Sequence, residues 1–193
     1  MAQQPLSIRR LKAASLANLL LLLALAFLLQ GCAALATPPA LTPASLGTSR
    51  SAVQQVRAAT PQGEVALQCV LSVTPERVTV AGLMPFGGRV FTLDYDGKTL
   101  ALQPGPFAGQ APPAEQILLA LQLALWPTQA WRDGLAASGW TLIEPRTGLR
   151  QLLHDGRVAV EARSDGDPWQ ARTLIINYPL RFSLEILPAP ATP

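Results

Sequence analysis

The sequence predicts an α+β domain in which one curved antiparallel β-sheet, an incomplete barrel, is covered by two central helices. Short runs of alternating apolar residues occur both before and after the middle of the chain. Two helix-like runs lie between them, and one of these is apolar nearly all round. Because such a helix must be buried, we expect the strands to pack their apolar face against it.

Residues 1–31 have the three parts of a secretory signal. Three basic residues precede the apolar run 16–29, which leads into Leu29-Gln30-Gly31-Cys32. This run is shorter than the roughly 20 apolar residues of a membrane-spanning helix, so an uncleaved anchor is the weaker interpretation. The last four residues resemble the lipobox of bacterial lipoproteins, which implies cleavage between Gly31 and Cys32.

The lipobox resemblance implies that Cys32 becomes the lipid-modified first residue of the mature protein. Several acyl chains at that residue would anchor the protein permanently. The second mature residue is Ala33, whereas an Asp there usually retains such proteins at the inner membrane of enteric bacteria. We therefore expect an outer-membrane lipoprotein that faces the periplasm.

The charge of the mature chain gives no reason to expect nucleic acid as a partner. Removal of residues 1–31 from 193 leaves 162 residues, which suits one domain. The full chain has 15 Lys and Arg against 12 Asp and Glu, but three of the basic residues lie in the signal. The mature chain is thus formally neutral, without the positive charge typical of nucleic-acid binding.

Residues 32–60 are rich in Ala, Pro, Thr and Ser and predict a flexible tether. The domain itself is expected over 61–188, followed by a loose tail at 189–193. Its first strand-like runs are Val65–Val73, Arg77–Met84, Arg89–Tyr95 and Lys98–Leu102. The dipeptide Asp96-Gly97 predicts a type I′ hairpin between the last two.

The central helices are expected at Ala114–Leu125 and Thr128–Ala137. Glu115 lies in the first turn of the earlier helix, where the helix dipole favours a carboxylate. Trp126-Pro127 should end that helix, because proline cannot continue it. Proline-rich segments bound the helix on both sides, so it could act as a lid.

Five strand-like runs follow the helices, at Trp140–Glu144, Leu149–Leu153, Arg157–Arg163, Ala171–Tyr178 and Leu180–Leu187. Asp155-Gly156 predicts another hairpin. The last two runs keep one phase of alternation across Pro179, which predicts a single long strand with an edge or bulge at the proline.

Two segments carry a family resemblance: FGGRVFTLDYDG at 86–97 and ILLALQLALWP at 117–127. They resemble an uncharacterised proteobacterial lipoprotein family that is associated with aryl polyene pigment gene clusters. The later segments Arg150-Gln151-Leu152 and Asn177-Tyr178-Pro179-Leu180 fit the same pattern, so the resemblance runs from Val65 to Ile186.

That family has no established activity to transfer. Its order of strands, helices and strands is similar to that of the lipoprotein localisation proteins LolA and LolB. In those proteins an incomplete barrel closed by helices shelters acyl chains. The analogy implies a LolB-like fold, and a fold alone does not determine function.

No catalytic centre is indicated by the titratable residues. His154 is the one histidine of the chain and falls beside Asp155 in a predicted turn, and no nucleophile elbow accompanies it. Asp94 and Asp96 are expected to face solvent next to a hairpin. Asp165-Gly166-Asp167 lacks the alternating ligands and distal Glu of a calcium loop.

Cys69 should be a buried, unreactive thiol. If the sulfur of Cys32 carries a lipid, no intramolecular disulfide can form. Cys69 lies on the apolar face of a predicted strand and has no basic neighbour to lower its pKa. One histidine and one buried cysteine cannot supply a zinc site, so we expect no metal and no cofactor.

The remaining candidate is an apolar lining between the first central helix and the sheet. Its members are Phe91, Leu93, Ile117, Leu118, Leu121, Leu125, Trp126, Trp140, Phe182 and Leu184. An ordinary core would show the same pattern. The anchor, the family resemblance and the proline-bounded helix favour a ligand cavity, in which each buried CH₂ of a ligand contributes about 0.8 kcal/mol.

The leading hypothesis is therefore a non-enzymatic outer-membrane lipoprotein that binds or transfers a hydrophobic acyl or aryl polyene lipid. Its membrane partner would be reached through the anchor at Cys32. The alternative is a structural or assembly lipoprotein that holds a protein partner by exposed sheet edges. An enzyme of unknown type is the third possibility.

Overall fold

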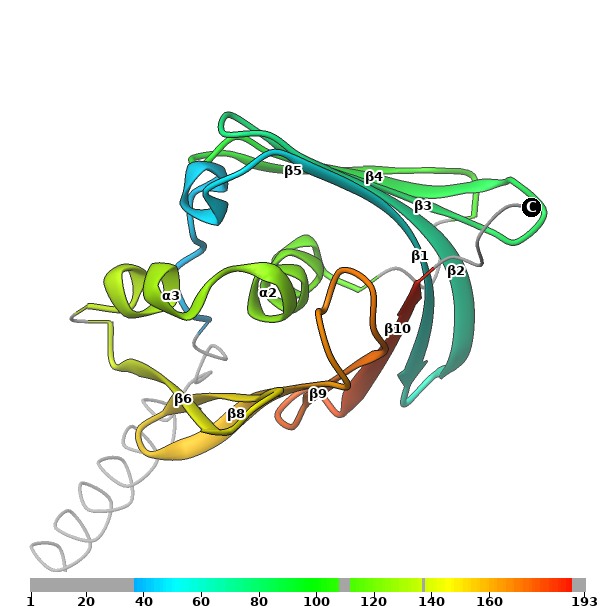
Figure 1. Cartoon of the computed structure of the whole chain (residues 1–193). Coiled ribbons are helices and arrows are strands. Elements are labelled where there is room, and N and C mark those ends of the chain that lie inside the picture. Colours follow the sequence, from blue (N-terminus) through cyan, green and yellow to red (C-terminus); the bar gives the residue numbers. More distant parts are fainter. Residues whose placement is uncertain (1–36, 108–111, 137, 189–193) are drawn as a thin grey trace, which may run out of the picture. The chain divides into compact units, whose positions relative to one another are not determined.

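A computed structural model describes residues 37–107, 112–136 and 138–188. Within them, ten strands form one antiparallel sheet that curves round two helices, α2 and α3 (Figure 1). The predicted fold class is confirmed at this level, since an open curved sheet with helices on its concave side is consistent with an incomplete barrel. The predicted signal peptide, Gly31, Cys32, the start of the tether and the tail at 189–193 lie outside the described residues.

The strands follow the order β5-β4-β3-β2-β1-β10-β9-β8-β7-β6 across the sheet. Their bounds are β1 Arg50–Thr60, β2 Gly63–Val73, β3 Val78–Leu83, β4 Arg89–Tyr95, β5 Leu100–Pro104, β6 Trp140–Arg146, β7 Leu149–His154, β8 Arg157–Ser164, β9 Thr173–Asn177 and β10 Phe182–Pro188. The first and last strands pair at the centre, with Gln54 opposite Pro188 and Ala59 opposite Ser183. Among the described strands, β5 and β6 have one neighbour each, so the sheet is open between them.

Strand β1 corrects the predicted tether and domain boundary. Residues 50–60 are not a linker but a long strand between β2 and β10. The alternation was hidden because Gln54 is buried on the concave side, whereas Val53 is 43% exposed on the other face. The apolar pattern of a half-buried strand is therefore absent, and the domain begins before residue 61.

The predicted long strand across Pro179 is also wrong. Strands β9 and β10 form a hairpin in which Phe182 pairs with Asn177. Arg181 has a φ of 54°, and the side chain of Asn177 accepts a hydrogen bond from the Leu180 amide at 3.0 Å. Because Pro179 has no amide hydrogen for a ladder, the chain turns at this point.

The two Asp-Gly dipeptides differ in the structure. Asp155 and Gly156 have φ values of 49° and 73°, as a type I′ turn requires, so that prediction is confirmed. At Asp96-Gly97 the type I′ prediction is wrong, because the glycine alone has a positive φ. The Asp96 carboxylate instead accepts the amides of Lys98 and Thr99 at 2.9 and 2.7 Å, which closes an Asx turn.

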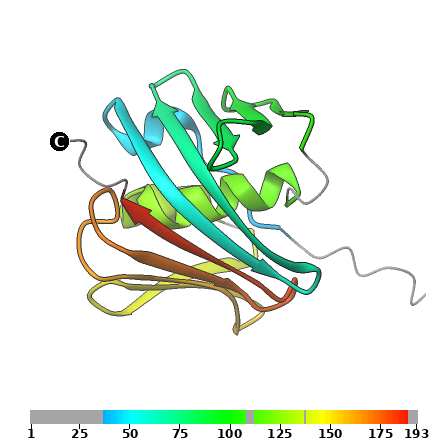
Figure 2. The same ribbon diagram turned by 90° about the vertical axis from the view of Figure 1, so that its right-hand side faces the viewer.

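Helix α2 spans Ala114–Leu125 and α3 spans Thr128–Gly134. The bounds of α2 are those predicted, and the backbone becomes extended at Trp126, directly before Pro127. Every residue from Leu118 to Leu125 is buried, as a helix that is apolar all round requires. Figure 2 shows α2 lying across the concave side of the sheet, behind β1, β2 and β10.

A strap, which we define as residues 37–46, corrects a second part of the predicted tether. It contains the short 3₁₀ helix η1, Pro43–Leu46, and its Leu41 is buried. The Leu41 amide donates to Oε1 of Gln122 at 2.9 Å, and Nε2 of Gln122 donates back to the Leu41 carbonyl at 2.6 Å. Nε1 of Trp126 donates to the Thr42 carbonyl at 3.2 Å. The strap is thus fixed to α2 and is not a loose linker.

Both helices are too short to span a bilayer, and none of the described segments contains a longer apolar helix.

Candidate functional site

The candidate site is an apolar groove between α2 and the concave face of the sheet, which encloses a cavity of about 70 Å³. Its walls are Gln54, Val56, Ala58, Val65, Leu67, Cys69, Leu71, Val80, Phe91, Pro112, Ile117, Ala120, Leu121, Leu184 and Ile186. None of these side chains is charged. We call this surface the apolar groove.

The alternation of the strands places apolar side chains in the groove. In β2, Leu67, Cys69 and Leu71 are buried while the residues between them are exposed. In β10, Leu184 and Ile186 follow the same period of two. Because β1 lies between β2 and β10, the three strands form one continuous apolar wall.

Helix α2 supplies the opposite wall with Ile117, Ala120 and Leu121. These positions lie three and four residues apart and share one face of a helix. Leu118 and Leu119 face a second cavity of about 380 Å³ beside the strap. Helix α2 is thus buried on more than one face, which explains why its sequence is apolar nearly all round.

The predicted lining residues fall into two groups. The structure brings four of them together in the apolar groove: Phe91, Ile117, Leu121 and Leu184. The other six are buried elsewhere: Leu93, Leu118, Leu125, Trp126, Trp140 and Phe182. Among these, Trp126 packs beneath the strap, and Trp140 stacks on His154 with ring centroids 4.6 Å apart.

Sequence reasoning missed the contribution of β1. Gln54, Val56 and Ala58 line the apolar groove but lie in the segment predicted as a tether. The signal that could have identified β1 is an alternation of inward and outward residues along 50–60. The polar Gln54 at an inward position obscures that alternation. Cys69 was placed correctly on the apolar face of a strand, although its presence in the groove depends on the pairing of β2 with β1.

Cys69 is free and buried in the wall of the groove. Burial raises the pKa of its thiol to about 12. The thiol therefore remains protonated at neutral pH, and the groove presents no negative charge to a ligand.

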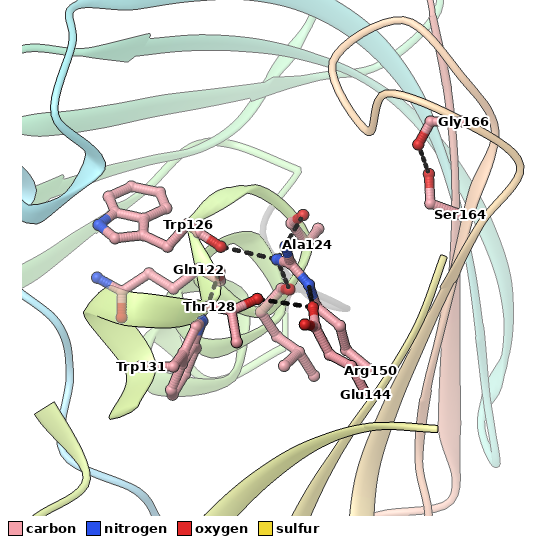
Figure 3. A network of polar contacts seen from close by, with 10 residues as sticks. Gln122, Ala124, Trp126, Thr128, Trp131, Glu144, Arg150, Ser164 and Gly166 are labelled. Carbon is pink, nitrogen blue, oxygen red and sulfur yellow. Dashed lines mark hydrogen bonds and ion pairs between the residues drawn. The ribbon is translucent and has the colours of Figure 1, made fainter. Parts of the chain in front are cut away.

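A polar network holds the carboxyl end of α2 (Figure 3). Arg150 on β7 donates from Nη1 to the carbonyls of Leu123, Ala124 and Trp126, at 3.2, 3.4 and 2.7 Å. Its Nε donates to Oε1 of Glu144 at 2.9 Å. A cation at this position pairs with the negative end of the helix dipole and with carbonyls that have no partner within the helix.

Glu144 completes this network from β6. Partial burial would raise the pKa of its carboxyl group, but hydrogen bonds from Thr128 and Arg150 and the charges of Arg150 and Arg132 outweigh that effect. The pKa of Glu144 consequently lies below its ordinary value. Glu144 and Arg150 also line a cavity of about 490 Å³, together with Leu123 and Ala124 of α2.

The titratable residues considered for catalysis lie in two different parts of the sheet, at the end of β7 and at the end of β4. His154 lies at the end of β7, with its Nδ1 3.5 Å from the Asp155 carboxylate. Asp94 accepts a hydrogen bond from Thr79 at 2.9 Å, and Asp96 closes the Asx turn. Within the described ranges, no group of three His, Cys, Asp or Glu side chains is placed to hold a metal ion.

Comparison with known proteins gives a family match over residues 51–190, to the family described as "Protein of unknown function (DUF3261)". The match begins within β1 and ends just after β10, so it covers the whole curved sheet. No curated protein matches the chain.

Proposed function

We propose that this chain, which belongs to the DUF3261 family, is a non-enzymatic lipoprotein of the outer membrane that binds or transfers a hydrophobic molecule. The observation that carries the proposal is the uncharged apolar groove between α2 and strands β1, β2 and β10. An apolar chain would gain about 0.8 kcal/mol for each CH₂ that it buries there.

A ligand of useful length requires α2 to move. The cavity of about 70 Å³ is well below the roughly 300 Å³ at which ligand pockets begin. The carboxyl half of α2 is held by Gln122 and Arg150, whereas the amino half, which contributes Ile117 to the groove, has one side-chain hydrogen bond to the sheet, between Gln116 and Asn177 at 2.9 Å. We infer that the amino half of α2 lifts from the sheet to admit the ligand.

The ligand class that we favour is an acyl or aryl polyene lipid. The resemblance of segments 86–97 and 117–127 to the lipoproteins of aryl polyene gene clusters supports it. The open sheet round a central helix is consistent with the incomplete barrel expected by analogy with LolA and LolB, which shelter acyl chains. The anchor at Cys32 would keep the groove close to a membrane from which such a lipid can be taken.

The alternative role, holding a protein partner by a sheet edge, is less supported by the edge strands. The edge strands β5 and β6 contain Pro104 and Pro145 respectively. Proline on an edge strand removes a hydrogen-bond donor and discourages strand addition. We therefore give preference to ligand binding.

The test uses the mature chain with the substitution Cys32→Ala, examined by native mass spectrometry and by displacement of a fluorescent fatty acid. We expect a co-purified lipid, or displacement of the probe by long-chain lipids. Ala58→Leu and Ala120→Leu fill the groove from its two walls and should weaken probe binding at least tenfold. Ala66→Leu is the matched control, because Ala66 is exposed on the adjacent strand β2.

Two variants are needed because either one could unfold the chain, and circular dichroism will show which remains folded. Absence of both bound lipid and probe binding in the chain with an unfilled groove would refute the proposal. Equal binding in folded groove variants and in Ala66→Leu would refute the assignment of the site.

A further inference from the structure

Gln54 stands out in the apolar groove because it is the one lining residue with a side-chain amide. It lies on β1, at the centre of the sheet, and is only 4% exposed. Its partners in the sheet are Cys69 on β2 and Pro188 on β10. The amide is therefore surrounded by side chains that offer no strong hydrogen-bond donor or acceptor.

The other buried glutamines show what a glutamine amide normally requires. Gln122 makes both of its hydrogen bonds with the backbone of Leu41. Gln116 accepts a hydrogen bond from Asn177 at 2.9 Å. Buried amides are almost always paired in this way, because an unpaired one loses its hydration without compensation.

In the described part of the chain, no hydrogen bond to the side chain of Gln54 is formed. Side-chain nitrogen and oxygen atoms that are fully enclosed there all have partners. Gln54 lines the cavity and keeps 4% of its surface exposed, so its side chain reaches the space of the groove. Its donor and acceptor are available to a molecule in the groove.

We propose that Gln54 recognises a neutral hydrogen-bonding group, such as a hydroxyl or an amide, on the ligand of the apolar groove. This inference rests on the proposed function and narrows its ligand class to a functionalised chain instead of a plain hydrocarbon. The group is neutral because no charged side chain lines the groove, and an unpaired charge there would be strongly disfavoured. A glutamine amide both donates and accepts, so it suits these groups.

The experiment compares three probes of equal chain length: dodecane, 1-dodecanol and dodecanamide. Each displaces a fluorescent fatty acid from the mature Cys32→Ala chain. With Gln54 present, the alcohol and the amide should bind about tenfold more tightly than dodecane, which corresponds to one recovered hydrogen bond. The ratio of affinities is the readout, because a purely structural role of Gln54 would not alter it.

Gln54→Leu replaces the amide by an apolar group of similar size. We expect this variant to lose the preference for the alcohol and the amide while keeping its affinity for dodecane. Its melting temperature should rise, because an unpaired amide is removed from an apolar surface. Gln55→Leu is the control, since Gln55 is the next residue of β1 and is exposed on the opposite face.

The outcomes separate this inference from the proposed function. If all three probes bind the Gln54 chain equally, or if Gln54→Leu keeps the preference, Gln54 does not recognise the ligand although the groove still binds apolar chains. If no probe binds to either chain, the proposed function and this inference both fail.

Discussion

At the scale of single residues, the free thiol of Cys69 reports whether the apolar groove is open to solvent. Its pKa of about 12 leaves about one thiol in ten thousand ionised at pH 8, compared with about one in ten at the ordinary value of 9.0. Burial also keeps reagents away from the sulfur.

We predict that iodoacetamide modifies Cys69 at least a thousandfold more slowly in the folded Cys32→Ala chain than in the same chain unfolded in urea, both at pH 8. The factor follows from the fraction of thiolate, which is the reactive form. Mass spectrometry of the alkylated chain over time gives both rates. Rapid modification of the folded chain would show that the groove is open to solvent without a ligand.

Individual site residues could be predicted only where their burial follows from local alternation. Cys69, Phe91 and Leu184 are predicted on apolar faces because apolar residues recur at every second position from each of them along its strand. Gln54 could not be recognised, because a polar residue at an inward position looks like an outward one. The pairing of Gln122 with Leu41 joins residues 81 positions apart, and no local pattern encodes it.

At the scale of elements, the strap and α2 behave as one unit. The two hydrogen bonds between Gln122 and Leu41 are buried, and Trp126 adds a third link to Thr42. Gly134 also lies against the Leu41 side chain. A larger residue at position 134 would displace that side chain. The carboxyl half of α2 is therefore anchored on its strap side as well as by Arg150.

We predict that Gln122→Leu lowers the free energy of unfolding by about 3 kcal/mol, because it leaves the buried amide and carbonyl of Leu41 without partners. Urea denaturation followed by circular dichroism measures this change. Hydrogen exchange at the Leu41 amide should become faster in the same variant.

Gln129→Leu is the control for this substitution, since Gln129 is exposed on α3. It should change the free energy of unfolding by no more than about 0.5 kcal/mol. A Gln122→Leu variant as stable as this control would mean that the strap contributes nothing to the fold.

The elements were predictable to the extent that each one was internally regular. Helix α2 was found with its observed bounds, because Trp126-Pro127 marks its end and its leucines require burial. Strand β1 was missed because its sequence mixes Gln and Ala at inward positions. The turn at Pro179 was misread because β9 and β10 keep the same phase on either side of it.

At the scale of the whole molecule, the curved sheet and its helices agree with the predicted fold class. The order of the strands across the sheet could not be predicted from local sequence patterns. The sequence indicates hairpins between several successive strands, which the structure contains, but not those that join β1 to β2 and β9 to β10. The pairing of β1 with β10 joins strands from opposite ends of the domain, so it could not be derived from either strand alone.

The anchor remains a prediction of the sequence, because Cys32 lies outside the described residues. We predict that the wild-type chain, expressed in a Gram-negative host, incorporates labelled palmitate and fractionates with the outer membrane. Cys32→Ala should abolish both the labelling and the cleavage after Gly31, while Cys69→Ala, as the control, should leave both unchanged. Continued labelling of Cys32→Ala would refute the anchor.

The central pairing of β1 with β10 also has a consequence for when the protein can fold. The strand nearest the beginning of the domain finds its second neighbour only in the last strand of the chain. Contacts between such distant segments form slowly, because a long loop must close before they contribute. During synthesis, the two hairpin-built halves of the sheet can therefore form early but cannot join until β10 has emerged. A chain exported from its amino terminus would thus stay incomplete, and competent for passage through a narrow translocation channel, until its last strand arrives.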